Sequence, residues 1–496
     1  MRNYRISLSL FLSLTLCALC LALASSAPQQ SAAAQQGKAV AAKDPQKPAT
    51  PAKPAAPVVN EDEPVALTPR TAAAVEDAPA KPAPTLLPNQ YGNFRFPAAN
   101  GKGQVAFLAI HTAPDTAAGY TQSLFVTSSD GAWKVTRESE KILNLKDDFN
   151  AINGVTINQN GDLTFTAQLA GKEPLPENPN APNREQFIPR GMGLFMKTAE
   201  GIKVLLRLGE EVPNMPSFFS SLANASSNSK GQTAFVGAYA DPDGKGLFIL
   251  ENGKARLIAR SGQKIVLGED RVFSEHYYPG RINERGEIAW LSRIGSDGAG
   301  IFVLRDGKIQ TLALQGKPAP VKYKDAVGKE KAANFIGFGN RAPAINDNGD
   351  VVFAAFYDGP EYGRALFMKP LNGPLQLLAK SGDGIKGMTV KFTDFNYVAL
   401  NNRGELAFLG NYGARTRGIF FRKGATIEPV VLLEQKLPNG KPEDIVNQFI
   451  APVINDRGEV FFYGQFRNSQ VALFQWDAAQ GLRTLARRGD KMPEIK

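Results

Sequence analysis

The stretch that decides the fold reads Ile454-Asn455-Asp456-Arg457-Gly458-Glu459-Val460-Phe461-Phe462. Its pattern is Asn-x-x-Gly with an aromatic side chain four residues after the Gly, and it occurs seven times in the 496-residue chain. The other copies, each given as its Asn, Gly and aromatic residue, are Asn100/Gly103/Phe107, Asn158/Gly161/Phe165, Asn228/Gly231/Phe235, Asn283/Gly286/Trp290, Asn346/Gly349/Phe353 and Asn401/Gly404/Phe408. Successive copies lie 54 to 70 residues apart, which predicts seven equivalent structural units.

The chemistry of the motif is that of a tight turn between two strands. An Asn side chain can accept a hydrogen bond from the backbone N–H two residues further on, and this starts a turn. The Gly supplies the left-handed backbone that closes a hairpin with a bulge. The aromatic residue then falls in the second strand, where alternation places it in the core. We therefore interpret the repeated Asn, Gly and aromatic residues as structural, and not as a sevenfold active site.

Each unit contains further strand signals around the motif. An aromatic or apolar stretch precedes the Asn, as in Phe392–Tyr397, and an alternating run follows it, as in Glu405–Leu409. An apolar pair ending in Phe comes next, such as Ile419-Phe420, and most units close with a Leu-rich run and a Gly, as in Leu257–Gly262. Four short strands per unit, without helical periodicity, predict an all-β fold: a seven-bladed β-propeller with four-stranded blades.

The order of strand types predicts how the ring closes. The repeats begin with an inner-type strand near Asn93–Ala98 and end with an outer-type strand near Leu482–Arg487. Each blade should therefore be one contiguous unit. The first and last blades should then meet by packing, without a strand borrowed from the other terminus.

A family resemblance rests on two phrases of the repeat. Ile454–Phe462 and Leu378-Ala379-Lys380-Ser381-Gly382-Asp383 resemble the tandem NxxGxxxF repeats of secreted bacterial proteins, over about residues 91–490. The Gly-Asp phrase recurs at Gly489-Asp490. The resemblance implies export and a propeller-like fold, and it implies no activity for particular residues.

The first 24 residues are typical of a signal peptide. Arg2 and Arg5 form a basic start, Ile6–Ala24 is uncharged, and Ala22-Leu23-Ala24 offers small residues for cleavage. An uncleaved membrane anchor is the competing interpretation. Cleavage leaves no membrane span and places the protein outside the cytoplasm, in the periplasm, outside the cell or at the cell surface.

Residues 25–90 are dominated by Ala and Pro and contain no aromatic residue, so they cannot bury a core, and we expect a disordered linker. The propeller is then residues 91–496. Both cysteines of the chain, Cys17 and Cys20, lie in the signal segment. The mature chain therefore has no disulfide, thiolate metal site or cysteine nucleophile.

Composition limits the chemistry of the repeat domain. The chain has a net charge of +10 and only two histidines, His111 and His276. The basic surplus is compatible with attraction to anionic glycans or lipids, whereas nucleic-acid binding is not expected without a basic cluster interleaved with aromatics. So few histidines disfavour a Ser-His-Asp triad or a histidine metal site. No catalytic residue, metal site or cofactor is predicted.

The loops predict where a ligand would bind. The Asn-x-x-Gly turns and the turns between third and fourth strands are short, so the variable loops share the opposite face, as insertions on a binding face often do. Long loops are expected at Leu169–Met192, Gly262–Arg271 and Gly316–Ala333. The candidate ligand residues on this face are Arg184, Glu185, His276, Tyr277, Lys322, Tyr323 and Lys324.

Three functions remain open at this point, because propellers host many functions. The leading one is a non-catalytic, monomeric, exported binding module that presents its variable face to a protein or glycan. A second is a hydrolase or lyase that acts on carbohydrate through carboxylates converging at the central channel. A third is a structural component of the cell envelope.

Overall fold

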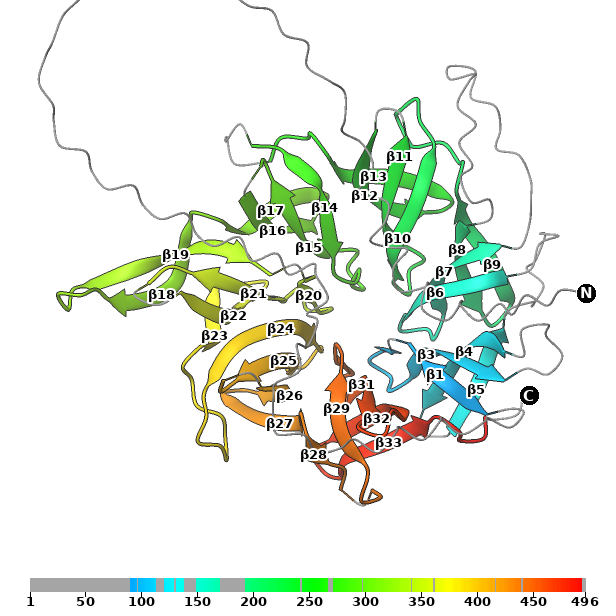
Figure 1. The fold of residues 1–496 in the computed structure, drawn as a ribbon. Coiled ribbons are helices and arrows are strands. Elements are labelled where there is room, and N and C mark those ends of the chain that lie inside the picture. The colour runs from blue at the N-terminus through cyan, green and yellow to red at the C-terminus, as the bar shows by residue number, and fades with distance from the viewer. Residues whose placement is uncertain are drawn as a thin grey trace, which may run out of the picture. The chain divides into compact units, whose positions relative to one another are not determined.

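Seven antiparallel sheets follow one another around a ring in the described part of the chain (Figure 1). The computed structural model describes residues 90–492 except 96, 113–119, 129–130, 138–148, 170–191, 241–242, 266–270, 297, 340, 360–361, 415 and 439. The predicted signal peptide and, except for Gln90, the predicted linker lie outside the described residues. The fold is an all-β, seven-bladed propeller, as the repeats predict.

Each blade is built from consecutive strands. Blade 1 contains β1 (Tyr91–Phe94), β2 (Ala98–Ala99), β3 (Val105–Thr112), β4 (Tyr120–Ser128) and β5 (Gly131–Arg137). Blade 2 contains β6 (Phe149–Ile157), β7 (Leu163–Leu169), β8 (Met192–Thr198) and β9 (Gly201–Arg207), and blade 3 contains β10 (Phe219–Ser227), β11 (Thr233–Ala240), β12 (Asp243–Glu251) and β13 (Lys254–Arg260). Blade 4 contains β14 (Phe273–Pro279), β15 (Ile288–Ile294), β16 (Gly298–Arg305) and β17 (Lys308–Leu314).

Two of the last three blades, blades 5 and 7, contain six strands each. Blade 5 contains β18 (Pro318–Lys324), β19 (Glu330–Phe338), β20 (Ala344–Ile345), β21 (Val351–Tyr357), β22 (Gly363–Lys369) and β23 (Gln376–Lys380). Blade 6 contains β24 (Phe392–Leu400), β25 (Leu406–Tyr412), β26 (Thr416–Lys423) and β27 (Thr426–Leu432). Blade 7 contains β28 (Gln435–Lys436), β29 (Ile445–Phe449), β30 (Val453–Ile454), β31 (Val460–Phe466), β32 (Val471–Asp477) and β33 (Gly481–Arg487).

An aromatic stack lies at the centre of every blade. The motif aromatic, on the second strand, faces a Phe of the third strand directly across the sheet, as Phe408 faces Phe420. The seven stacks have ring centroids 5.0 to 5.8 Å apart. Every motif aromatic is buried, so the prediction that it belongs to the core is confirmed.

The first and last blades meet as blades 5 and 6 meet. The Gly489 N–H donates to Tyr91 O at 2.8 Å, and the Tyr91 N–H donates to Asp490 O at 3.1 Å. Blades 5 and 6 share the same pair of bonds, in which Gly382 N–H donates to Phe392 O and Phe392 N–H donates to Asp383 O. Contiguous blades without a borrowed strand are confirmed, and these backbone bonds add to the packing at the closure.

One predicted loop is a hairpin. Residues 316–333 were expected to form an irregular loop between blades 4 and 5, but β18 pairs with the first half of β19. Alternating Ala319 and Val321 are buried against the blade, which explains why this segment is a strand. In Figure 1 the hairpin extends outward from the ring.

Two other predicted loops lie largely or partly outside the residues that the structure describes. Of the loop at Leu169–Met192, only its two end residues are described, and residues 266–270 of the loop at Gly262–Arg271 are likewise not described. Within the described residues, no helix has the length and apolar character needed to cross a membrane.

Candidate functional site

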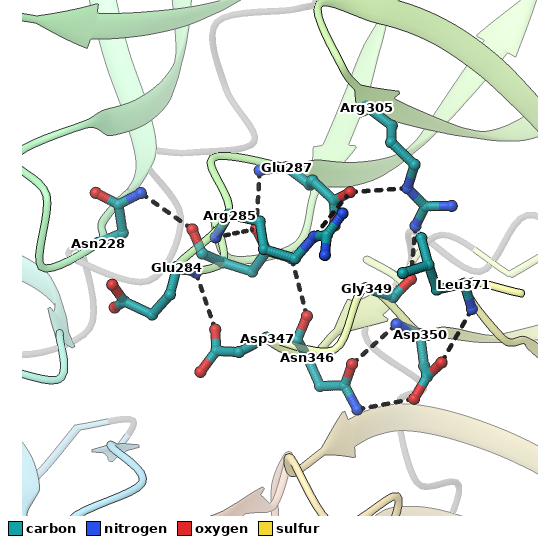
Figure 2. Close-up of polar contacts among 11 residues, drawn as sticks. Asn228, Glu284, Arg285, Glu287, Arg305, Asn346, Asp347, Gly349, Asp350 and Leu371 are labelled. Atoms are coloured by element: carbon teal, nitrogen blue, oxygen red, sulfur yellow. Dashed lines mark hydrogen bonds and ion pairs between the residues drawn. The ribbon is translucent and has the colours of Figure 1, made fainter.

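The motif asparagines link neighbouring blades around the channel. In six successive pairs the Asn Nδ2 donates to the backbone oxygen of the next blade's Asn, at 2.9 to 3.3 Å. Figure 2 shows this bond leaving Asn228 for blade 4. The series runs from Asn100 to Asn455, and among the described residues no matching bond returns from Asn455 to Asn100. We call this series the asparagine belt.

Each belt amide is satisfied inside its own turn as well. Asn401 is 3% exposed, and its Oδ1 accepts the N–H groups of Arg403 (3.0 Å) and Glu405 (2.9 Å). Its Nδ2 donates to Glu405 Oε2 at 2.8 Å in addition to Asn455 O. The turn chemistry of Asn predicted the bond accepted from the residue two positions on, whereas the bond accepted from the residue four positions on and the two donated bonds were not predicted. The sequence does mark the acceptor within each turn, because the residue after each motif Gly is Gln, Asp or Glu in all seven units.

The residue after each Asn forms a second ring of contacts. Five of these residues donate a backbone N–H to the side chain at the same position in the next blade, at 2.8 to 3.1 Å. One such bond joins Glu284 N–H to Asp347 Oδ1 (Figure 2). At Gly101 a side chain is absent, and the carboxylate of Asp456 occupies the space that a Cβ would need.

These turns enclose a polar cavity of about 100 Å³ at the motif-turn end of the channel, lined by residues from all seven blades. Its carboxylates are Glu284, Asp347 and Asp456. Asn402 Nδ2 donates to Asp347 Oδ2 at 2.8 Å and to Asp456 Oδ2 at 2.9 Å. Because one nitrogen binds both carboxylates, Asp347 and Asp456 lie close together, as paired acids must for glycoside hydrolysis.

The same carboxylates already serve as acceptors between blades. Asp347 Oδ1 accepts the Glu284 N–H, and Asp347 Oδ2 accepts Asn402 and, at 3.4 Å, Gln159. Asp456 Oδ1 accepts the Asn402 N–H at 2.8 Å. Acids that exchange protons with a substrate need free oxygens within reach of it, whereas these oxygens hold the ring together.

Arg281 spans the channel beside this cavity. It belongs to blade 4, and its Nη1 donates to Ala99 O of blade 1 at 2.6 Å. The side chain is half-buried and lines the cavity. Burial lowers the pKa of Arg281 to about 10. A charged side chain across the channel leaves little room for a polymeric substrate to pass.

A buried ion pair within blade 4 also donates a hydrogen bond to blade 5. Arg305, 6% exposed, donates from Nε to Glu287 Oε1 at 2.8 Å and from Nη2 to Gly349 O at 2.6 Å (Figure 2). Glu287 also accepts the belt amide of Asn283. In the described part of the chain, no group of three or more His, Cys, Asp or Glu side chains is placed to hold a metal ion.

The candidate ligand residues chosen from the sequence are only partly described by the structure. Arg184 and Glu185 lie outside the described residues, as does the side chain of His276, whose backbone is in β14. Tyr277 is 5% exposed and packs with Phe273 in the core. Its ring packs in the core of the blade, and a role for Tyr277 in ligand binding stays a prediction. Burial raises the pKa of the Tyr277 hydroxyl.

The other three candidates lie together on β18. Lys322 and Lys324 are exposed, and Tyr323 between them packs partly against the blade 5 core. Lys322 Nζ lies 2.7 Å from Glu330 Oε1 across the hairpin. The turn adds Lys329 and the opposite strand adds Lys331, both exposed, so the hairpin carries four lysines and two carboxylates.

The tip of this hairpin repeats the geometry of the motif turns. Asp325 Oδ1 accepts the N–H groups of Val327 (3.1 Å) and Lys329 (2.9 Å), and the Gly328 N–H donates to Asp325 O. Gly328 has a φ of +81°. The hydrogen bond from the Lys329 N–H is the main reason why the pKa of Asp325 is lowered. The lysines are therefore held on a defined turn.

Fold and channel together define the class of this protein, a seven-bladed β-propeller closed by polar contacts between blades. The chain belongs to the family of unknown function DUF7453, whose model matches residues 66–245 and 193–423. No curated protein matches it.

Solved structures with a similar fold come from several organisms. A puromycin-hydrolysing peptidase of Mycobacterium tuberculosis is 13% identical, with a TM-score of 0.41, and the alignment covers 83% of this chain and 57% of that chain. The acylaminoacyl peptidase of Pyrococcus horikoshii is 11% identical, with a TM-score of 0.42 and coverages of 81% and 52%. The Aleuria aurantia lectin in complex with α-methyl-L-fucoside is 10% identical, with a TM-score of 0.30 and coverages of 82% and 99%. The chain thus spans little more than half the length of either peptidase.

Proposed function

We propose that this protein is an exported, non-catalytic binding module that holds an anionic partner of the cell envelope on the hairpin of blade 5. The β18–β19 hairpin carries the proposal, because it presents four exposed lysines on a hydrogen-bonded turn. Among the described residues, no carboxylate pairs with Lys324 or Lys329. Their charges are therefore available to a partner, and the export signal at residues 1–24 brings the domain to the envelope.

A carbohydrate-active enzyme fits the channel less well. Asp347 and Asp456 are close enough to cooperate, but their oxygens bind neighbouring blades. They also lie at the motif-turn end of the channel, where Arg281 reaches across to Ala99. A purely structural role predicts self-association, whereas a binding module of this kind should sediment as a monomer.

The test compares two polymers that differ only in charge. The full chain should bind dextran sulfate in low salt and should not bind uncharged dextran, with an affinity that falls as salt screens the lysines. The variant K324Q/K329Q should bind about tenfold more weakly, since exposed ion pairs contribute up to about 1 kcal/mol each.

A matched control is available on the other face of the ring. Lys254 and Lys308 are exposed at turns between third and fourth strands, so K254Q/K308Q removes the same charge at the opposite end of the blades. This variant should bind like the unmodified chain. Equal loss in both variants would mean that net charge, and not the hairpin, drives binding, and would refute the proposal.

A further inference from the structure

We infer that the β18–β19 hairpin docks on an anionic lipid surface, with Val327 at its tip entering the headgroup region between Lys324 and Lys329. This inference rests on the proposed function and names the partner of the same site. It concerns peripheral attachment, in which an apolar side chain and surrounding lysines act together.

The placement of apolar side chains supports a lipid partner. Among the described residues only two large hydrophobic side chains are strongly exposed, Val327 at 86% and Tyr362 at 66%. Both belong to blade 5, and Tyr362 lies in the loop between β21 and β22. Asn334 of β19 binds Asp358 of that loop through its N–H (2.7 Å) and its side chain (3.1 Å). Apolar and amphipathic side chains beside lysines suit a membrane interface.

The rigidity of the tip strengthens this argument. A flexible loop would lose conformational freedom when Val327 becomes buried, and this loss opposes binding. Here Asp325 binds the N–H groups of Val327 and Lys329, so the loop is ordered before contact. Lys331 lies 3.2 Å from Asp325 and supports the same turn.

Two other partners explain less of the hairpin. An extended peptide could add to the free edge of β18, but Pro318 and Pro320 cannot donate backbone hydrogen bonds there. An acidic glycan accounts for the lysines and leaves the exposed Val327 without a role. An anionic bilayer accounts for both, because the lysines approach the headgroups while the valine leaves water.

The test uses vesicles of phosphatidylcholine alone or with 30% phosphatidylglycerol. The full chain should sediment with the anionic vesicles more than with the neutral ones, and high salt should remove the difference. K324Q/K329Q should lower this charge-dependent part about fivefold per lysine. V327S should lower binding to the anionic vesicles about fivefold, because the buried valine is lost, and K254Q/K308Q should leave that binding unchanged.

A fluorescent probe at the tip separates hairpin contact from binding elsewhere on the chain. Tryptophan emission from V327W should shift to the blue on anionic vesicles and be quenched by brominated lipid. A control, K308W, should show neither effect. If V327W remains unshifted while the chain still binds dextran sulfate through its hairpin, the lipid inference is overturned and the proposed function stands. If neither vesicles nor dextran sulfate bind through the hairpin, both fail.

Discussion

Replacing Asn401 by alanine tests how much the asparagine belt contributes to the free energy of unfolding. The side chain makes four hydrogen bonds, two donated and two accepted, at 2.8 to 3.0 Å, and it is 3% exposed. A buried hydrogen bond contributes about 1 kcal/mol net, and buried groups left unpaired cost more. We therefore expect N401A to lower the free energy of unfolding by about 4 kcal/mol.

Asn455 provides the matched comparison for this variant. It is 1% exposed and makes three corresponding bonds within its own turn, at 2.6 to 3.0 Å, without the bond to the next blade. N455A should therefore cost about 3 kcal/mol, and the difference of about 1 kcal/mol is the contribution of one belt bond.

Urea unfolding of the full chain, followed by circular dichroism, measures both variants. A third variant, N401D, keeps the shape of the side chain. It replaces the N–H donor that faces the Asn455 carbonyl and Glu405 with an acceptor oxygen, so N401D should lower the free energy of unfolding by at least as much as N401A. If N455A costs as much as N401A, the bond between blades contributes nothing and the reasoning is refuted.

Three further predictions concern single positions. In G101A the new methyl group would overlap the Asp456 carboxylate, so we expect a loss of about 1–3 kcal/mol in unfolding free energy; an unchanged thermal midpoint would contradict this packing. In W290F a buried indole N–H that has no partner among the described residues disappears, which offsets part of the cost of the cavity that the smaller ring leaves, so stability should change by no more than about 1 kcal/mol; a loss above about 3 kcal/mol would contradict this balance. At Glu405, burial alone would raise the pKa, but bonds from Asn401 and Arg403 outweigh it and the pKa is lowered. The stabilising effect of the Glu405 carboxylate should be present above the ordinary glutamate pKa and be lost as the pH falls through the lowered pKa. The unfolding midpoint of E405Q should therefore fall less between pH 7 and pH 3 than that of the unmodified chain. An equal fall would exclude this role for Glu405.

The fold was predictable because the repeat marks the same turn and the same core position seven times. The chemistry of Asn and Gly predicted each turn, and the aromatic residue predicted the second strand. The phrase Gly489-Asp490, which matches Gly382-Asp383, also marked the contact that closes the ring. These features depend on local sequence, and local sequence was sufficient for them.

The channel was not predictable in the same way. Residues after each Asn differ between blades, and only the curvature of the ring brings Asp347 and Asp456 to one amide of Asn402. The hydrogen bond from Arg281 to Ala99 joins residues 182 positions apart, and no local sequence pattern predicts it.

Two prolines explain why the β18–β19 hairpin was not predicted from the sequence. Ala319, Val321 and Tyr323 alternate with exposed residues, which is a strand pattern, but Pro318 and Pro320 argue against a strand in the interior of a sheet. At an edge they are tolerated. Asp325-x-x-Gly328 also matches the motif turn, with Asp in place of Asn, so this turn does carry a sequence signal.

Hydrogen exchange of the full chain, alone and with a bound anionic probe, tests the central claim most directly. With dextran sulfate or anionic vesicles in excess, we predict new protection of backbone amides in residues 318–334 and unchanged exchange in the motif turns around the channel. New protection confined to the turns at Glu284, Asp347 and Asp456 would instead place the binding site in the channel and contradict the account.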